Sequence, residues 1–133
     1  MNQFEELEQG IAAWLEALLS QEVCPRIQRG TVVPDEGAAV AVIASLPAET
    51  GALRRCRIRV AGAFAERSGA LALAGIGERE LPRFGGVFGS IRLAALLLHE
   101  VEESAAVQSA GALRYRTVLQ LEAAYLPAKE VRV

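Results

Sequence analysis

The stretch ALRYRTVLQLEAAYL (residues 112–126) decides how the rest of the chain must be organised. Its side chains alternate between two faces. One face carries Leu113, Tyr115, Thr117, Leu119, Leu121, Ala123 and Tyr125, and the other carries Arg114, Arg116, Val118, Gln120, Glu122 and Ala124. A period of two over this length predicts a long β-strand with one buried face and one face that meets water or a partner. Because a single strand is not stable alone, other segments must pair with it and cover its apolar face.

The composition predicts one small domain that spans residues 1–133. Hydrophobic residues make up 52% of the chain but aromatic residues only 5%, so we expect a closely packed core of Leu, Val, Ile and Ala. The net charge is −2, from 14 basic and 16 acidic residues. This balance gives the whole chain no attraction to nucleic acid or to an anionic membrane, and we expect neither as a partner.

The cysteines and the N-terminus indicate a cytoplasmic protein. Cys24 and Cys56 lie far apart and match neither a metal-ligand spacing nor a CxxC motif. We interpret them as small buried apolar residues in a reducing compartment. No basic region precedes an apolar stretch at the N-terminus, so we expect no signal peptide. No apolar run reaches the roughly eighteen residues that a membrane helix needs.

Residues 3–20 have the pattern of an amphipathic helix. Apolar side chains recur there at spacings of three and four: Phe4, Leu7, Ile11, Trp14, Leu15 and Leu18. Asn2 is the expected N-cap, because its side chain can accept a hydrogen bond from a free backbone N–H of the first turn. Trp14 lies on the apolar side, so we expect it to contribute to the core.

Three strands are predicted in the segment that follows this helix. They cover residues 27–33, 38–46 and 53–67, and turns rich in Pro and Gly at residues 34–37 and 47–51 separate them. Both faces of residues 38–46 are mostly apolar, which predicts a central strand. The strand at residues 53–67 is as long as the one at residues 112–126.

A row of arginines, Arg55, Arg57 and Arg59, lies on one face of the third predicted strand. If that strand pairs with residues 112–126, Arg114 and Arg116 extend the row. One interpretation is a solvated outer face on which glutamates oppose the arginines across the strands. The other is a positive stripe that contacts a second subunit or a partner. The first is favoured because charged rows are common on half-buried sheets, although an acidic neighbour must then relieve the repulsion between like charges.

The second half of the chain up to residue 111 is predicted as an irregular segment and a helix. Residues 68–83 are expected to form a loop, because Gly75, Gly77 and Pro82 interrupt any longer element. Residues 91–106 are rich in Leu and Ala and predict a helix with Ser90 as its N-cap. Its solvent side would carry Glu100, Glu102 and Glu103.

Together these elements predict an α+β fold. It consists of an antiparallel sheet of about four strands, with the N-terminal helix and the helix at residues 91–106 packed on it. Residues 127–133 are expected to form a loose tail or to dock on a neighbour.

No catalytic, cofactor-binding or metal-ligating residue is predicted, so we do not expect an enzyme. The glycine-rich residues 84–90 match neither GxGxxG nor GxxxxGK[ST], and no lysine lies near them. His99 is the only histidine and belongs to no HExxH motif, so a surface or packing role is expected. No serine lies in a GxSxG elbow.

Four stretches carry a resemblance to a known family. They are FEELEQGIAAWLEALL (residues 4–19), RCRIRVAGAFAERS (55–68), IRLAALLLHEVEES (91–104) and ALRYRTVLQLEAAYLP (112–127). In order and length they resemble the small tail-terminator, tail-completion and minor tail proteins of tailed phages and prophages. Residues 68–89 depart from that layout, because they are longer and more glycine-rich.

The resemblance implies a structural protein without a catalytic site. Such proteins form a ring, commonly of six subunits, that caps the tail tube and meets the head connector. The implied partners are other copies of the chain, the tail tube and the connector, and the implied location after assembly is the virion tail. Subunit contacts would use a sheet edge and loops, and would include Arg55, Arg57, Arg59, Arg114 and Arg116.

Two alternatives come from other classes of protein. One is a non-viral adaptor domain that dimerises through a sheet edge or the helix at residues 91–101 and has no catalytic activity. The other is a small enzyme with a pocket between sheet and helix. That enzyme would need His99, Arg114 or Glu122 to converge on one concave site.

Overall fold

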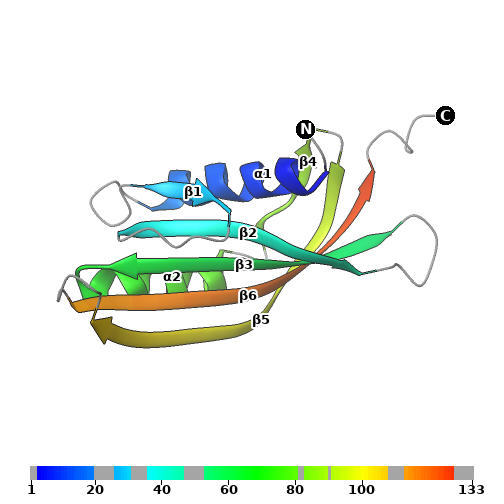
Figure 1. Ribbon diagram of the computed structural model, residues 1–133. Coiled ribbons are helices and arrows are strands. Elements are labelled where there is room, and N and C mark those ends of the chain that lie inside the picture. Colours follow the sequence, from blue (N-terminus) through cyan, green and yellow to red (C-terminus); the bar gives the residue numbers. More distant parts are fainter. Residues whose placement is uncertain are drawn as a thin grey trace.

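The structure is a computed structural model that describes residues 3–19, 26–30, 36–46, 53–80, 83–89, 91–107 and 113–127. The described residues form two helices and six strands (Figure 1). In chain order they are α1 (Gln3–Leu18), β1 (Ile27–Arg29), β2 (Gly37–Leu46), β3 (Arg54–Phe64), α2 (Arg67–Arg79), β4 (Gly86–Phe88), β5 (Ile91–Val107) and β6 (Leu113–Pro127).

The six strands form one curled sheet in the order β1-β2-β3-β6-β5-β4. The β1–β2 pair is parallel and every other pair is antiparallel. The predicted α+β class is therefore confirmed, but the prediction of about four antiparallel strands is wrong. The sequence pattern did not predict β4 or β5 as strands, and it did not indicate that β1 pairs in parallel with β2.

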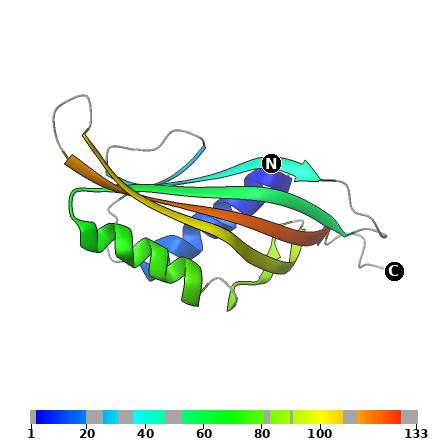
Figure 2. The same ribbon diagram turned by 90° about the horizontal axis from the view of Figure 1, so that it is seen from below.

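Both helices pack on the same face of the sheet, which we call the inner face (Figure 2). The buried core lies between them and the strands, and Trp14 packs against it with its ring centroid 4.7 Å from that of Phe84. The fully buried larger side chains come from both helices and four strands: Leu7, Ile11, Leu15, Val40, Ile58, Phe64, Leu73, Ile91, Leu119, Leu121 and Tyr125. The opposite side of the sheet, the outer face, carries no helix in the described part of the chain.

The prediction of a loop at residues 68–83 is wrong, because Arg67–Arg79 form the helix α2. Two of its three glycines, Gly69 and Gly77, lie where the helix approaches the sheet closely. A Cβ atom added to Gly69 would lie 2.8 Å from Phe64 ring atoms, and one added to Gly77 would lie 2.9 Å from Leu119 Cδ2. Burial of Leu73 and Ile76 then offsets the helix propensity lost at each glycine, which is roughly 1 kcal/mol.

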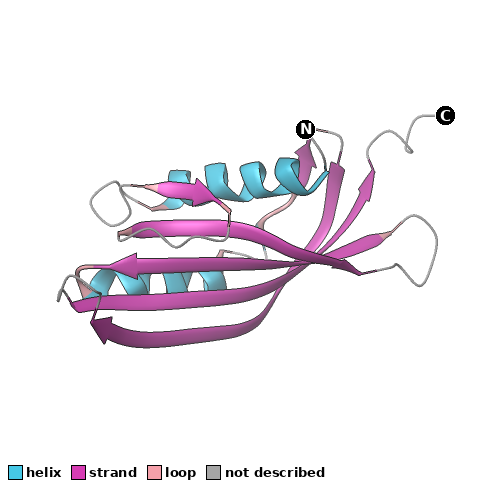
Figure 3. Ribbon diagram, viewed as in Figure 1, coloured by secondary structure: helices cyan, strands magenta, loops and turns pink. Residues whose placement is uncertain are grey.

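The prediction of a helix at residues 91–106 is wrong, because Ile91–Val107 form the strand β5 (Figure 3). It pairs with β6 along its whole length, with register shifts between Leu93 and Ala95 and between Leu98 and Glu100. Each shift adds one residue and moves the following side chains to the other face. The inward apolar residues Leu93, Leu96, Leu98 and Val101 are consequently spaced by three, two and three, which resembles helical spacing.

The glycine-rich segment before β5 forms a hairpin rather than a helix N-terminus. Phe88 pairs with Ile91, so the β4–β5 connection has two residues. Its first residue, Gly89, has a φ of +58°, which glycine adopts without the steric cost that a side chain imposes.

Several predictions lie outside the described residues. These are the caps Asn2 and Ser90, the burial of Cys24, the end of the first predicted strand at residues 31–33, and the tail at residues 128–133.

Candidate functional site

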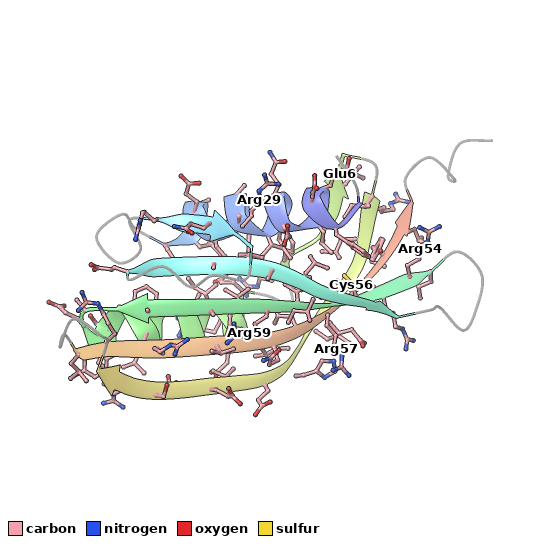
Figure 4. The ribbon with its side chains drawn as sticks, viewed as in Figure 1. Glu6, Arg29, Arg54, Cys56, Arg57 and Arg59 are labelled. Atoms are coloured by element: carbon pink, nitrogen blue, oxygen red, sulfur yellow. The ribbon has the colours of Figure 1, made fainter. Side chains whose placement is uncertain are left out.

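The arginine row lies on the outer face, as its alternation predicted. Arg55 and Arg57 are exposed and Arg59 is half-buried, while Cys56 and Ile58 between them are buried on the inner face. Figure 4 labels Arg57, Arg59 and Cys56 of this strand. β6 supplies the acidic neighbour that the row requires. Glu122 lies directly opposite Arg57, and Ala124 and Gln120 lie opposite the other two arginines. Opposite charges in such a cross-strand pair contribute roughly 0.2–1 kcal/mol.

Arg114 and Arg116 lie on the same face but do not continue the row. Arg116 pairs with Ala63, four residues beyond Arg59 and about 13 Å along the strand. The outer-face positions near that gap are small and buried: Ala39, Ala41, Ala61 and Ala63 are each at most 5% exposed. The open part of the outer face is therefore the end that carries Arg55, Arg57 and Arg59.

Two large apolar side chains flank the arginine row on the outer face. Ile43 lies at a register shift of β2 beside Arg57, and Leu97 of β5 pairs with Glu122. Both side chains are 53% exposed. We call this set the arginine patch: Ile43, Arg55, Arg57, Arg59, Leu97 and Glu122.

The opposite side of the molecule carries charges of both signs, because the exposed Arg29 contacts α1 and α2 contains the exposed Arg67 and Arg79. Glu5 and Glu16 lie on the exposed side of α1, which points away from the sheet. Phe4 and Leu18 lie near the two ends of the helix, on the same side as its buried residues, and are 38% and 40% exposed. The buried side chains of the helix face the core. We call these four residues the α1 patch. The arginine patch and the α1 patch thus lie on opposite sides of the sheet and carry opposite charge.

The residues that an enzyme would need do not converge. His99 Nε2 lies 4.0 Å from Glu122 Oε1, but the His99 side chain is 58% exposed on the open outer face. Arg114 pairs with Ala106, eight residues from Glu122 along β6 and about 26 Å away. Its guanidinium donates a hydrogen bond to the carbonyl of Leu113. The structure therefore places His99 at the surface and does not assemble the three residues around one cavity.

The β5 strand leaves a long edge without a partner strand. β4 pairs only with residues 91–93, so residues 94–107 have a described strand, β6, on one side only. An edge of this kind presents unpaired backbone N–H and C=O groups to any extended segment that approaches. Glu100, Glu102 and Glu103 on it are exposed, as expected for the solvent side of this segment.

The other edge of the sheet is short and partly closed. β1 has three residues, and the Arg29 guanidinium donates to the backbone carbonyl of Glu5 in α1. Beyond β1, the backbone N–H of Val42 donates to Glu8 Oε2 at 3.1 Å. The Glu8 carboxylate thus accepts a hydrogen bond that a neighbouring strand would otherwise accept. The β1–β2 edge is partly covered by α1 in this way, whereas residues 94–107 of β5 have a described strand on one side only.

Cys56 is buried and is not a nucleophile. Burial, and to a lesser extent the nearby charge of Glu122, raises the pKa of its thiol from 9.0 to about 12. Because the thiolate is the reactive form, this cysteine stays unreactive near neutral pH.

In the described ranges, no three His, Cys, Asp or Glu side chains gather in a way that could hold a metal ion. None of the helices there is long and apolar enough to cross a bilayer.

Comparison with models of known protein families gave no match, and comparison with curated proteins gave none either. The function is therefore inferred from the geometry of the two patches and the open edge.

The sequence located the arginine row but missed the open edge of β5. The apolar residues of that segment were assigned to a helix, and strand order cannot be read from one sequence. The clustered acids Glu100, Glu102 and Glu103 were the available signal, because charged side chains are a common device on exposed edge strands.

Proposed function

We propose that this chain is a non-catalytic structural protein of a phage or prophage tail. Copies assemble into a ring at the head-proximal end of the tail and join the tail tube to the head connector, as the resemblance to tail terminators implies. The proposal includes no cofactor, no membrane and no nucleic-acid partner. It is carried by one observation: two patches of opposite charge lie on opposite sides of one subunit.

Such a pair of patches favours head-to-tail association. A contact between two different surfaces cannot close on itself in a dimer, and it continues until the copies form a ring or a filament. Glu5 and Glu16 of one copy would face Arg55 and Arg57 of the next. The exposed apolar side chains Phe4, Leu18, Ile43 and Leu97 would supply the apolar part of the interface.

Charge reversal with complementation tests this association. The first variant is Arg55→Glu/Arg57→Glu and the second is Glu5→Arg/Glu16→Arg, and light scattering and negative-stain microscopy report mass and shape. We expect the wild type to form rings and each variant alone to be monomeric. A mixture of the two variants should form rings of alternating subunits with an even number of copies. A wild type that stays monomeric at high concentration contradicts the proposal, as does a variant that assembles normally.

A second candidate is a non-viral adaptor that dimerises through the β5 edge. The observation that favours it is the difference between the edges, because a single open edge pairs most simply with the same edge of a second copy about a twofold axis. This candidate predicts a dimer whose mass does not change in Arg55→Glu/Arg57→Glu. Head-connector and tail-tube genes beside this gene would favour the ring instead.

A further inference from the structure

The open edge of β5 and the helix α2 border two separate pockets, and we call this edge with its pockets the β5–α2 groove. A pocket of about 380 Å³ lies where residues 94–98 face Phe84 and the C-terminal part of α2 at Gly77. A second pocket of about 280 Å³ lies where Glu103 and Ala105 face Arg67 near the helix N-terminus. The two pockets lie near opposite ends of α2, one beside residues 94–98 of β5 and the other beside residues 103–105.

The length of the β5 edge between the two pockets suits an extended peptide. A strand rises about 3.3 Å per residue, so a segment of about eight residues covers the distance from Leu96 to Glu103. An added strand would hydrogen-bond to the backbone groups of residues 94–107 that point away from β6. Every second side chain of that strand would point to the inner side, toward the pockets, and the others would lie on the outer face.

The charges on β5 determine the chemistry of the peptide. Glu100 and Glu102 are exposed and lie on the outer face, opposite Gln120 and Val118 of β6. Residues 94–107 contain no lysine or arginine. An added strand would therefore gain from basic side chains at its outer positions, and an acidic strand would be repelled.

The same charges disfavour a second copy as the occupant. Pairing β5 with β5 would bring acidic strands together. The other edge strand of the sheet, β1, has only three residues, and its Arg29 already binds α1. No described edge of this chain offers a basic strand of the required length.

We propose that the β5–α2 groove binds an extended, basic segment of a different protein by strand addition. Basic side chains of that segment lie beside Glu100 and Glu102, and one apolar side chain enters the pocket lined by Phe84, Leu96 and Leu98. This inference goes beyond the ring and does not depend on it. A peptide can bind whether or not the copies assemble.

Fluorescence anisotropy with short designed peptides tests the groove. The probe is a labelled peptide of alternating Arg and Val, and the same peptide with Glu in place of Arg is the charge control. We expect saturable binding of the first and none of the second. Two further peptides carry N-methyl groups on one or the other alternate set of backbone amides.

These N-methylated peptides separate strand addition from simple charge attraction. The amide groups of a strand point alternately to its two sides, so methylation of one set should weaken binding on the order of tenfold or more, and methylation of the other set should not. Equal binding of the two methylated peptides would overturn the proposal. Displacement of the peptide by dimerisation of the protein would also overturn it, because the occupant would then be a second copy.

Protein variants locate the site. We expect Glu102→Lys to weaken binding of the Arg–Val peptide, whereas Glu36→Lys makes the same change in charge near the start of β2 and should leave binding unchanged. Ala94→Trp should fill the apolar pocket and weaken binding without altering the charge. Thermal unfolding confirms that each variant is folded. Equal effects of Glu102→Lys and Glu36→Lys would show that only net charge matters, and this result would overturn the inference.

Discussion

At the scale of single residues, Thr117 is the one buried polar side chain among the described residues. Its hydroxyl donates to the backbone carbonyl of Ala70 at 2.8 Å and so joins β6 to α2. Thr117→Val keeps the shape but removes the donor, and we expect it to lower the free energy of unfolding by about 1 kcal/mol. Urea denaturation measures this loss. Thr117→Ser keeps the donor, so if it costs as much as Thr117→Val, the methyl group matters and the hydrogen bond does not.

A second residue-scale prediction concerns alkaline pH. The folded pKa of Cys56 is raised to about 12, so the folded state keeps its thiol proton where the unfolded chain has lost it. The contribution is full below the unfolded pKa near 9.0 and is lost as pH rises toward 12. We expect the wild type to lose stability between about pH 8 and pH 10.5 faster than Cys56→Ala, which lacks the titrating group. Parallel pH curves for the two proteins would contradict this.

At the scale of elements, two glycines of α2 should respond to alanine in opposite ways. A methyl group at Gly75 meets only the flexible, exposed end of Arg79, so Gly75→Ala should stabilise the protein by about 0.5–1 kcal/mol. At Gly77 the methyl meets the buried side chain of Leu119, so Gly77→Ala should destabilise it by about 1–3 kcal/mol. Thermal unfolding of the pair gives the comparison. A shift of the same sign in both would show that propensity, not packing, controls these sites.

The hydrogen bond between Glu8 and β2 supports a further prediction about an element. Glu8→Ala leaves the N–H of Val42 without its acceptor at the sheet edge, and we expect a loss of about 1 kcal/mol or more. Glu8→Gln retains an oxygen acceptor and should lose less. Hydrogen exchange of the Val42 amide reports the bond directly, and an exchange rate that is equal in wild type and Glu8→Ala would rule out this role.

The elements with an uninterrupted period were predicted correctly. α1 repeats apolar residues at three and four, and β6 alternates along its length, so both were identified. β5 was assigned to a helix because its two register shifts break the alternation, and α2 was missed because its glycines lower helix propensity. The register shifts and the glycines depend on contacts with neighbouring elements. The pattern of a single sequence does not contain that information.

The sequence predicted part of the candidate site, as it predicted part of the fold. Alternation placed Arg55, Arg57 and Arg59 on one face, and the requirement for an acidic neighbour was met by Glu122. The break between this row and Arg116 was not predictable, because it depends on the register of β3 against β6. The open edge likewise follows from the order of the strands, to which residues far apart in the chain contribute.

At the scale of the whole molecule, the distribution of charge matters more than its sum. A net charge of −2 gave no indication of a charged partner. The fold nevertheless separates two groups of charge, with Arg55, Arg57 and Arg59 on the outer face and Glu5 and Glu16 on the exposed side of α1. Glu100 and Glu102 of β5 share the outer face with these arginines. Placing both helices on one face of the sheet produces this separation, because it leaves the other face to the alternate residues of β3 and β6.

The last prediction follows from this separation and concerns the assembly. If the arginine patch and the α1 patch form the contact between copies, that contact should weaken as salt screens it. The Debye length falls from about 8 Å at physiological ionic strength to about 3 Å at 1 M. We therefore expect the mass measured by light scattering to fall with added sodium chloride, with the rings dissociating to monomers. Pairing of β5 edges depends on backbone hydrogen bonds and joins strands of like charge, so salt should preserve or strengthen it. A mass that rises with salt would thus exclude the charged contact and favour the edge.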